Sequence, residues 1–289
     1  MDIFVTPFLA NEFMIRALIA GFLVSVASAV VGTFMVLRGL AFIGDALAHG
    51  VLPGIAVSIL WGFPGILGAA MGAVVMIGGI SLITHHSRLT SDTAIGLLFV
   101  GMLALGVMIV SRGRSFTGDL VRVLFGEILG IGRQGLLIQA AASLLVIATA
   151  MICVRPFLLL CFSPEQAEVA GFSVRIYHNI MLLLIALAII VSFQTVGTLL
   201  VFGMLLAPAS AAALVARRIG SMMILATFLG TLSVYLGLLL SYHFGLAAAA
   251  AIVVVATLVF FVVLARQNMR GIGLPETKSR RHGSLRLHP

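Results

Sequence analysis

Residues 179–216 read NIMLLLIALAIIVSFQTVGTLLVFGMLLAPASAAALVA, a run of 38 residues without a charged side chain. An α-helix rises about 1.5 Å per residue, so about 20 apolar residues cross the hydrocarbon core of a membrane. The run is therefore long enough for two membrane spans. Gly197 and Pro208 interrupt it, and because both residue types weaken a helix, we expect a turn at the first and a kink at the second.

The rest of the chain repeats this apolar pattern. Of its 289 residues, 62% are hydrophobic and 9% are charged, whereas a soluble domain usually carries about 25% charged residues. Residues 219–265 form a second long apolar run, which divides at Tyr242–Gly245 into two spans. Five further spans are expected at Ala17–Leu37, Gly39–Gly62, Pro64–Thr84, Thr93–Ser111 and Gln134–Val154. We predict an all-α, polytopic membrane helical bundle with nine spans, with eight as the alternative count.

The positions of Arg and Lys predict the orientation, since these residues gather on the cytoplasmic side of a membrane protein. Residues 1–266 are expected to form the membrane domain, and residues 267–289 a disordered, basic cytoplasmic tail. The tail is expected to touch anionic lipid rather than nucleic acid. The N-terminus then lies outside. Residues 112–133 disagree, because they hold four arginines in an outer segment, where Leu120–Ile131 is expected to form a short helix.

Asp45 is the carboxylate expected within a span, where a charge is costly unless it has a partner or a function. His49 follows four residues later, so both side chains project from one face of a helix. A carboxylate oxygen and an imidazole nitrogen together suit Mn²⁺, Fe²⁺ or Zn²⁺. The pair is therefore a candidate metal site, and a buried Asp–His hydrogen bond is the alternative interpretation.

Pro53 and Gly54 follow this pair directly and predict a kinked or broken helix. Broken helices in transporters often expose backbone carbonyls beside the substrate path. Pro53, Gly54, Gly197 and Pro208 are thus candidate path residues. A kink that serves only helix packing is the alternative at each position.

Residues 163–175 predict a short helix on the cytoplasmic side. Ser163 is a suitable N-cap, Pro164 suits the first helical position, and Glu165 suits the positive end of the helix dipole. Gly171 is a suitable C-terminal cap. A structured connector between two spans would carry the same signals, so the pattern alone does not assign a partner.

Several enzyme signatures are absent from the sequence. A phosphate-binding loop needs Gly-Lys-Ser/Thr, yet the only lysine is Lys278 in the tail. Cys153 and Cys161 lack the CxxC spacing of a zinc or redox site. No HExxH or GxSxG motif occurs. The chain is therefore not expected to hydrolyse ATP with a phosphate-binding loop or to act as an intramembrane hydrolase.

Residues 35–54 read MVLRGLAFIGDALAHGVLPG. This segment resembles the hallmark of the permease subunits of zinc, manganese and iron ABC importers, in which a basic residue is followed by Gly-Asp, His and Pro-Gly at this spacing. Residues 124–130 (LFGEILG), 163–171 and 196–209 resemble three further segments of the same family, in the same order. The resemblance covers residues 12–266.

The resemblance implies a type II ABC importer-like fold and a permease that forms a homodimer around a central path in the bacterial cytoplasmic membrane. A separate pair of ATPase chains would hydrolyse ATP and dock on Ser163, Glu165, Glu168 and Gly171. An extracytoplasmic metal-binding protein would deliver the divalent ion, which is cargo and not a cofactor. Asp45 and His49 stand at the family's matching positions.

Two features depart from the family pattern. The family usually shows Phe-Asp before the coupling helix, whereas this chain has Phe162-Ser163, and the basic tail is an addition. Two alternative functions stay open from the sequence: an ABC permease for a metal chelate such as a siderophore, and a stand-alone ion-coupled carrier. The sequence does not choose among manganese, zinc and iron.

Overall fold

The computed structural model describes residues 7–8, 10–87, 89–111, 126 and 128–269, and every regular element within them is a helix. Eight apolar helices in this part of the chain are long enough to span a membrane; one of them, Ala41–Trp61, is formed by α3 and α4 together. The predicted all-α membrane bundle is confirmed. The full-length spans besides α3–α4 are α2 (Glu12–Leu37), α5 (Gly65–His86), α6 (Ser91–Val110), α8 (Arg133–Ile152), α11 (Val174–Val196), α13 (Ile219–Phe244) and α14 (Ala248–Met269).

The two long apolar runs divide at glycines. α11 ends at Val196 and α12 (Thr198–Val215) begins directly after Gly197, which has a φ of 79°. α13 is followed by Gly245 with a φ of 64°. A positive φ is costly for residues with a side chain, so these glycines permit the two sharp turns. α12 is an apolar helix shorter than the eight full-length spans, and with it the described helices account for the nine expected spans. It contains the buried Pro208.

α2 begins five residues before the expected Ala17. Its first turn carries Glu12, which pairs with Arg16 one turn later, and Arg133 approaches the same carboxylate at 3.6 Å. Because these charges neutralise one another at the helix end, the helix extends beyond its uncharged part.

Two short helices join α8 to α11. They are α9 (Val154–Phe162) and α10 (Pro164–Val169). α9 was not predicted, although Pro156 near its start is a helix-start signal. Of the expected outer helix Leu120–Ile131, the structure describes residues 126 and 128–131, where Ile128–Gly130 forms a 3₁₀ turn (η1), and the remainder lies outside the described residues. The expected tail also lies outside them from residue 270 onward, while α14 continues to Met269.

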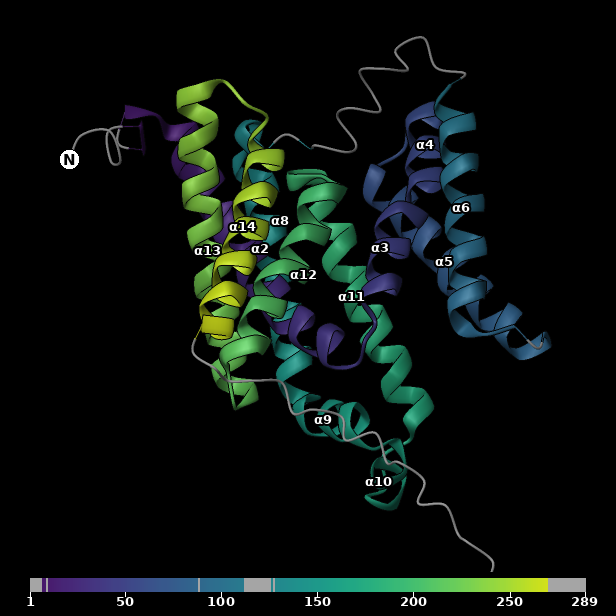
Figure 1. The fold of residues 1–289 in the computed structure, drawn as a ribbon. Helices are drawn as coiled ribbons and strands as arrows, with labels where there is room; N and C mark the ends of the chain where they lie inside the picture. Colours follow the sequence, from purple (N-terminus) through teal and green to yellow (C-terminus); the bar gives the residue numbers. More distant parts are fainter. Residues whose placement is uncertain (1–6, 9, 88, 112–125, 127, 270–289) are drawn as a thin grey trace, which may run out of the picture.

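Figure 1 shows how the helices are arranged. α4, α5 and α6 form a group on one side, and α3 stands between this group and helices α11 and α12. α9 and α10 lie at the lower end of the picture, the C-terminal end of α14 points toward that end, and α2 begins at the opposite end. The segment expected to contact the ATPase and the start of the basic tail therefore share one end of the molecule.

Candidate metal path and coupling segment

Asp45 and His49 lie on one face of α3 (Ala41–Gly50), as their spacing predicts. His49 Nδ1 lies 3.3 Å from Asp45 Oδ1 and 3.1 Å from the backbone oxygen of Asp45. A carbonyl oxygen only accepts hydrogen bonds, so in the neutral tautomer that satisfies this contact Nδ1 carries the proton and Nε2 is the nitrogen that can bind a metal. This is the arrangement in which a histidine commonly binds a metal, with its other ring nitrogen held by an oxygen.

Both side chains of the pair are partly accessible. Their exposed fractions are 23% for His49 and 30% for Asp45 in the single chain. His49 lies eight residues after Ala41, about 12 Å along the helix axis, which places it well inside the span. The pair thus has polar atoms at membrane depth that an ion can reach.

The neighbours of α3 fix the position of this pair. The Phe99 ring of α6 meets the His49 ring edge-on, with centroids 5.6 Å apart. On another side a Cβ at Gly44 would lie 2.8 Å from the sulfur of Met35 and 3.6 Å from the ring of Phe202. α3 therefore packs tightly against α2 and α12, and α6 orients the imidazole.

The break after His49 lies between two helices of the bundle. α3 ends at Gly50 and α4 (Leu52–Trp61) begins two residues later, with the buried Pro53 in its first turn. A Cβ on Gly54 would overlap the carbonyl oxygen of Gly68 in α5. A Cβ on Gly106 of α6 would lie 3.1 Å from the backbone nitrogen of Pro53. Close helix packing thus accounts for Gly54, while a role of these residues in the ion path stays a prediction.

Gly197 and Pro208 lie in the other half of the bundle. Gly197 forms the turn between α11 and α12, and Pro208 lies inside α12. A Cβ on Gly32 of α2 would overlap the carbonyl oxygen of Leu205, one turn before Pro208. α12 therefore contacts α2 backbone to backbone in this region.

The predicted coupling segment has the expected local structure. The Ser163 side chain accepts a hydrogen bond from the Gln166 backbone N–H at 3.3 Å, and Pro164 opens the six-residue α10. After α10, the Gly171 N–H bonds the Glu168 carbonyl at 2.9 Å, and Gly171 adopts a φ of 83°. The cap, the proline start and the glycine stop together fix a single turn-and-a-half of helix.

α10 presents a mixed surface to its surroundings. Glu165 and Glu168 are exposed, Val169 is 90% exposed, and Phe162 just before the helix is 75% exposed. Apolar side chains this exposed, beside two acids at one end of a membrane protein, are typical of a protein–protein contact surface.

A contact that the sequence analysis missed joins the two regions. Arg38, in the turn between α2 and α3, donates a hydrogen bond from Nη1 to the Leu160 carbonyl of α9 at 3.2 Å. Burial raises the pKa of the nearby Cys161 thiol above its ordinary value, and the positive charge of Arg38 offsets part of this rise. This bond connects the segment that bears α10 to the turn that leads into the Asp45 helix. The sequence showed the basic residue Arg38, but the carbonyl that it contacts lies 122 residues away in the chain, so the bond could not be predicted.

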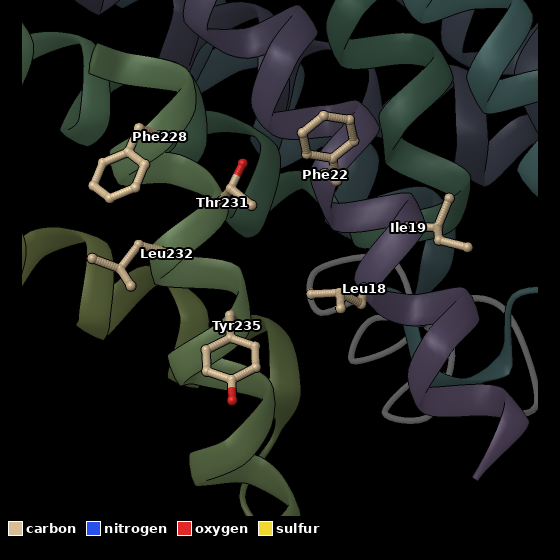
Figure 2. Close-up of a pocket in the computed structure, with 7 residues that line it drawn as sticks. All are labelled: Leu18, Ile19, Phe22, Phe228, Thr231, Leu232 and Tyr235. Atoms are coloured by element: carbon tan, nitrogen blue, oxygen red, sulfur yellow. The ribbon is translucent and has the colours of Figure 1, made fainter. Parts of the chain in front are cut away.

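A groove between two long helices lacks metal-binding groups among the residues that line it. Figure 2 shows a groove between α2 and α13, and its lining contains no carboxylate, imidazole or thiol. The residues that line it are Leu18, Ile19, Phe22, Phe228, Thr231, Leu232 and Tyr235. Within the described residues, no group of three or more His, Cys, Asp or Glu side chains lies close enough to hold a metal ion. One chain therefore supplies the Asp45–His49 pair and no larger ligand set in its described part.

Comparison with known proteins identifies the family of this chain. A sequence model of the ABC 3 transport family matches residues 10–267. The manganese transport system membrane protein MntC of Listeria innocua is 37% identical over 270 residues, which cover 93% of this chain and 96% of that protein. The chain belongs to the ABC 3 transport family.

Two further relatives agree with this membership. The chelated iron transport system membrane protein YfeD of Yersinia pestis is 35% identical, with 92% of this chain and 89% of that protein covered. The solved structure of PsaBC from Streptococcus pneumoniae in complex with Fab superposes with a TM-score of 0.83 at 32% identity, covering 90% of this chain and 94% of that one. This ABC 3 family protein is thus an ABC transporter permease subunit, a multi-pass protein of the bacterial cytoplasmic membrane and not itself an ATPase.

Proposed function

We propose that this permease carries a divalent metal ion, manganese, zinc or iron, into the cell as part of an ATP-driven importer. The observation that carries the proposal is the Asp45–His49 pair, whose Nδ1–Oδ1 distance is 3.3 Å on one face of a helix within a span. Relatives named for manganese transport support this choice of cargo, whereas a relative named for chelated iron transport keeps a metal chelate as the alternative cargo. Family membership removes the support for a stand-alone carrier.

The proposed assembly contains two copies of the chain, two separate ATPase chains and an extracytoplasmic metal-binding protein. The ATPases dock on α10, where Glu165, Glu168 and Val169 are exposed. Movement of α10 reaches the metal-binding helix through α9 and the hydrogen bond from Arg38 to Leu160. Asp45 and His49 hold the ion only in part, because a complete ligand set would trap it.

The test is uptake of radioactive Mn²⁺ and Zn²⁺ by the assembled transporter with Asp45→Asn or His49→Ala. Each change removes one metal donor, so transport should fall more than tenfold in both variants. Asp92→Asn and His243→Ala are matched controls, because Asp92 lies in the first turn of α6 and His243 Nδ1 contacts a backbone oxygen four residues earlier, as His49 does. These controls should transport normally.

Two outcomes would overturn the proposal or part of it. Transport at the wild-type rate by either Asp45→Asn or His49→Ala, with assembly verified, would make the pair structural. Uptake of a chelated metal that free Mn²⁺ and Zn²⁺ do not inhibit would identify a chelate as the cargo instead.

A further inference from the structure

A cavity of about 450 Å³ lies at the C-terminal ends of α12 and α14, beside α13. Six of its nine lining residues are apolar, and two are arginines. The lining residues are Leu214, Val215, Ala216, Arg217, Leu225, Leu229, Val263, Arg266 and Gln267. None of its lining residues belongs to α3, the helix that carries Asp45 and His49.

The third polar residue of the wall is already engaged. The Gln267 side-chain amide donates a hydrogen bond of 2.7 Å to the Leu214 carbonyl, which ties the end of α14 to the end of α12. The two exposed guanidinium groups of Arg217 and Arg266 are therefore the polar groups that the cavity offers to a ligand. Guanidinium groups bind phosphate through paired N–H donors.

The chain supplies no negative charge to this cavity from the helices that form it. No acidic residue occurs between Glu168 and Glu276, so α12, α13 and α14 carry no carboxylate. In the part of the chain that the structure describes, Arg217 and Arg266 each lack a salt-bridge partner. The described helices around this apolar hollow therefore leave two exposed arginines without a carboxylate partner, which gives the hollow a net positive charge that attracts anions.

The location restricts which anion this is. The cavity lies at the end of the bundle that also carries α10 and the end of α14, the cytoplasmic end by the distribution of arginines (Figure 1). An anionic headgroup bound there would lie beside the guanidinium groups, and its acyl chain would meet the apolar wall formed by Leu225, Leu229 and Val263. We propose that this cavity binds an anionic phospholipid of the inner leaflet.

The apolar wall distinguishes a phospholipid from free phosphate. A small anion would use Arg217 and Arg266 alone and leave the leucines and valines of the wall exposed. A phospholipid satisfies both halves, because its phosphate takes the charge and its acyl chain covers the apolar surface. Since α12, α13 and α14 all contribute to the wall, the bound lipid would also hold these three helices together.

The test is native mass spectrometry of the full-length protein, titrated with phosphatidylglycerol or with phosphatidylcholine. We expect wild-type protein to retain phosphatidylglycerol in preference to phosphatidylcholine. The Arg217→Gln/Arg266→Gln double variant should bind phosphatidylglycerol about tenfold or more weakly, because each basic side chain near a membrane surface contributes to binding of anionic lipid. If the double variant does not assemble, the two single variants should each show part of the loss.

The matched control is Arg155→Gln/Arg175→Gln, which removes two exposed positive charges from α9 and the start of α11, outside the cavity. This control should bind phosphatidylglycerol as the wild type does. An equal loss in both double variants would reduce the effect to general surface charge, and unchanged binding in the cavity variant would refute the site. Displacement of the lipid by inorganic phosphate or glycerol phosphate would show a free-phosphate site instead.

Discussion

At Gly54 the missing side chain lets α4 touch the backbone of α5. A Cβ there would overlap the Gly68 carbonyl oxygen and lie 2.9 Å from the Gly72 nitrogen. Gly54→Ala must therefore push α4 and α5 apart, at a cost of about 1–3 kcal/mol. We expect a lower thermal unfolding temperature and less assembled protein, measured by size exclusion after heating in detergent.

The control for this change is Gly101→Ala on α6, where a Cβ would meet nothing within 4 Å. Alanine is the better helix former by about 0.5–1 kcal/mol, so this variant should be as stable as the wild type or more so. Equal stability of the two alanine variants would show that the α4–α5 contact does not need Gly54. Reduced transport by Gly54→Ala alone would not place Gly54 in the ion path.

At Ser163 the structure explains why the family's usual aspartate is replaceable. The serine hydroxyl accepts the Gln166 N–H at the start of α10, as an aspartate carboxylate would. Ser163→Asp should therefore keep transport close to the wild-type rate. Ser163→Ala loses the cap, which stabilises a helix start by about 1 kcal/mol, and should lower the coupling of ATP hydrolysis to transport. Comparing transport per ATP hydrolysed in the two variants checks this, and equal coupling would make the cap irrelevant.

At the scale of the element, substitutions in α10 test whether the ATPase docks on this helix. Glu165→Lys/Glu168→Lys reverses both exposed acids of the helix. If the ATPase contacts α10, the double variant should still fold, but ATP hydrolysis should no longer drive ion uptake. Asp92→Lys is the matched control, since Asp92 is an acid in the first turn of α6 away from α10. Normal transport by the α10 variant would contradict docking there.

Features that depend on nearby residues could be predicted from the sequence. The cap at Ser163, the glycine stop at Gly171 and the break beside Pro53 each follow from local backbone chemistry. The Asp45–His49 pair also follows, because helical spacing alone brings residues four apart onto one face.

Features that depend on distant segments could not be predicted in this way. The Phe99 ring reaches His49 only because α6 packs against α3. The bond from Arg38 to Leu160 joins residues 122 positions apart. α9 was missed because it is too short for a span and begins at Val154, where the fifth expected span ends. Each of these depends on tertiary packing, for which one sequence carries no periodic signal.

At the scale of the molecule, the candidate metal pair Asp45–His49 lies at a boundary between two groups of helices. α4, α5 and α6 contact one another and meet the rest of the bundle chiefly through α3 and α11. α3 also touches α12, so the helix that carries Asp45 and His49 belongs to both groups. A relative movement of the two groups would therefore change the surroundings of the pair, which is what a transient ion site requires.

The number of metal ligands in one chain bears on how many chains would hold the ion. Divalent transition metals take about four to six ligands, and the described part of one chain holds the Asp45–His49 pair but no group of three or more His, Cys, Asp or Glu side chains. Two copies facing one path would supply two pairs, so the ion would contact both copies at once. One defective copy should then disable the whole transporter.

Mixed dimers test this directly. A wild-type copy and an Asp45→Asn copy with different affinity tags can be co-expressed and purified in two steps, so that only mixed dimers remain. If both pairs bind the same ion, the mixed dimer should transport Mn²⁺ as poorly as the Asp45→Asn homodimer, more than tenfold below the wild type. A mixed dimer with Asp92→Asn should be normal. If each copy instead moved ions alone, the Asp45→Asn mixed dimer would retain about half of the wild-type rate, because one of its two pairs would be intact.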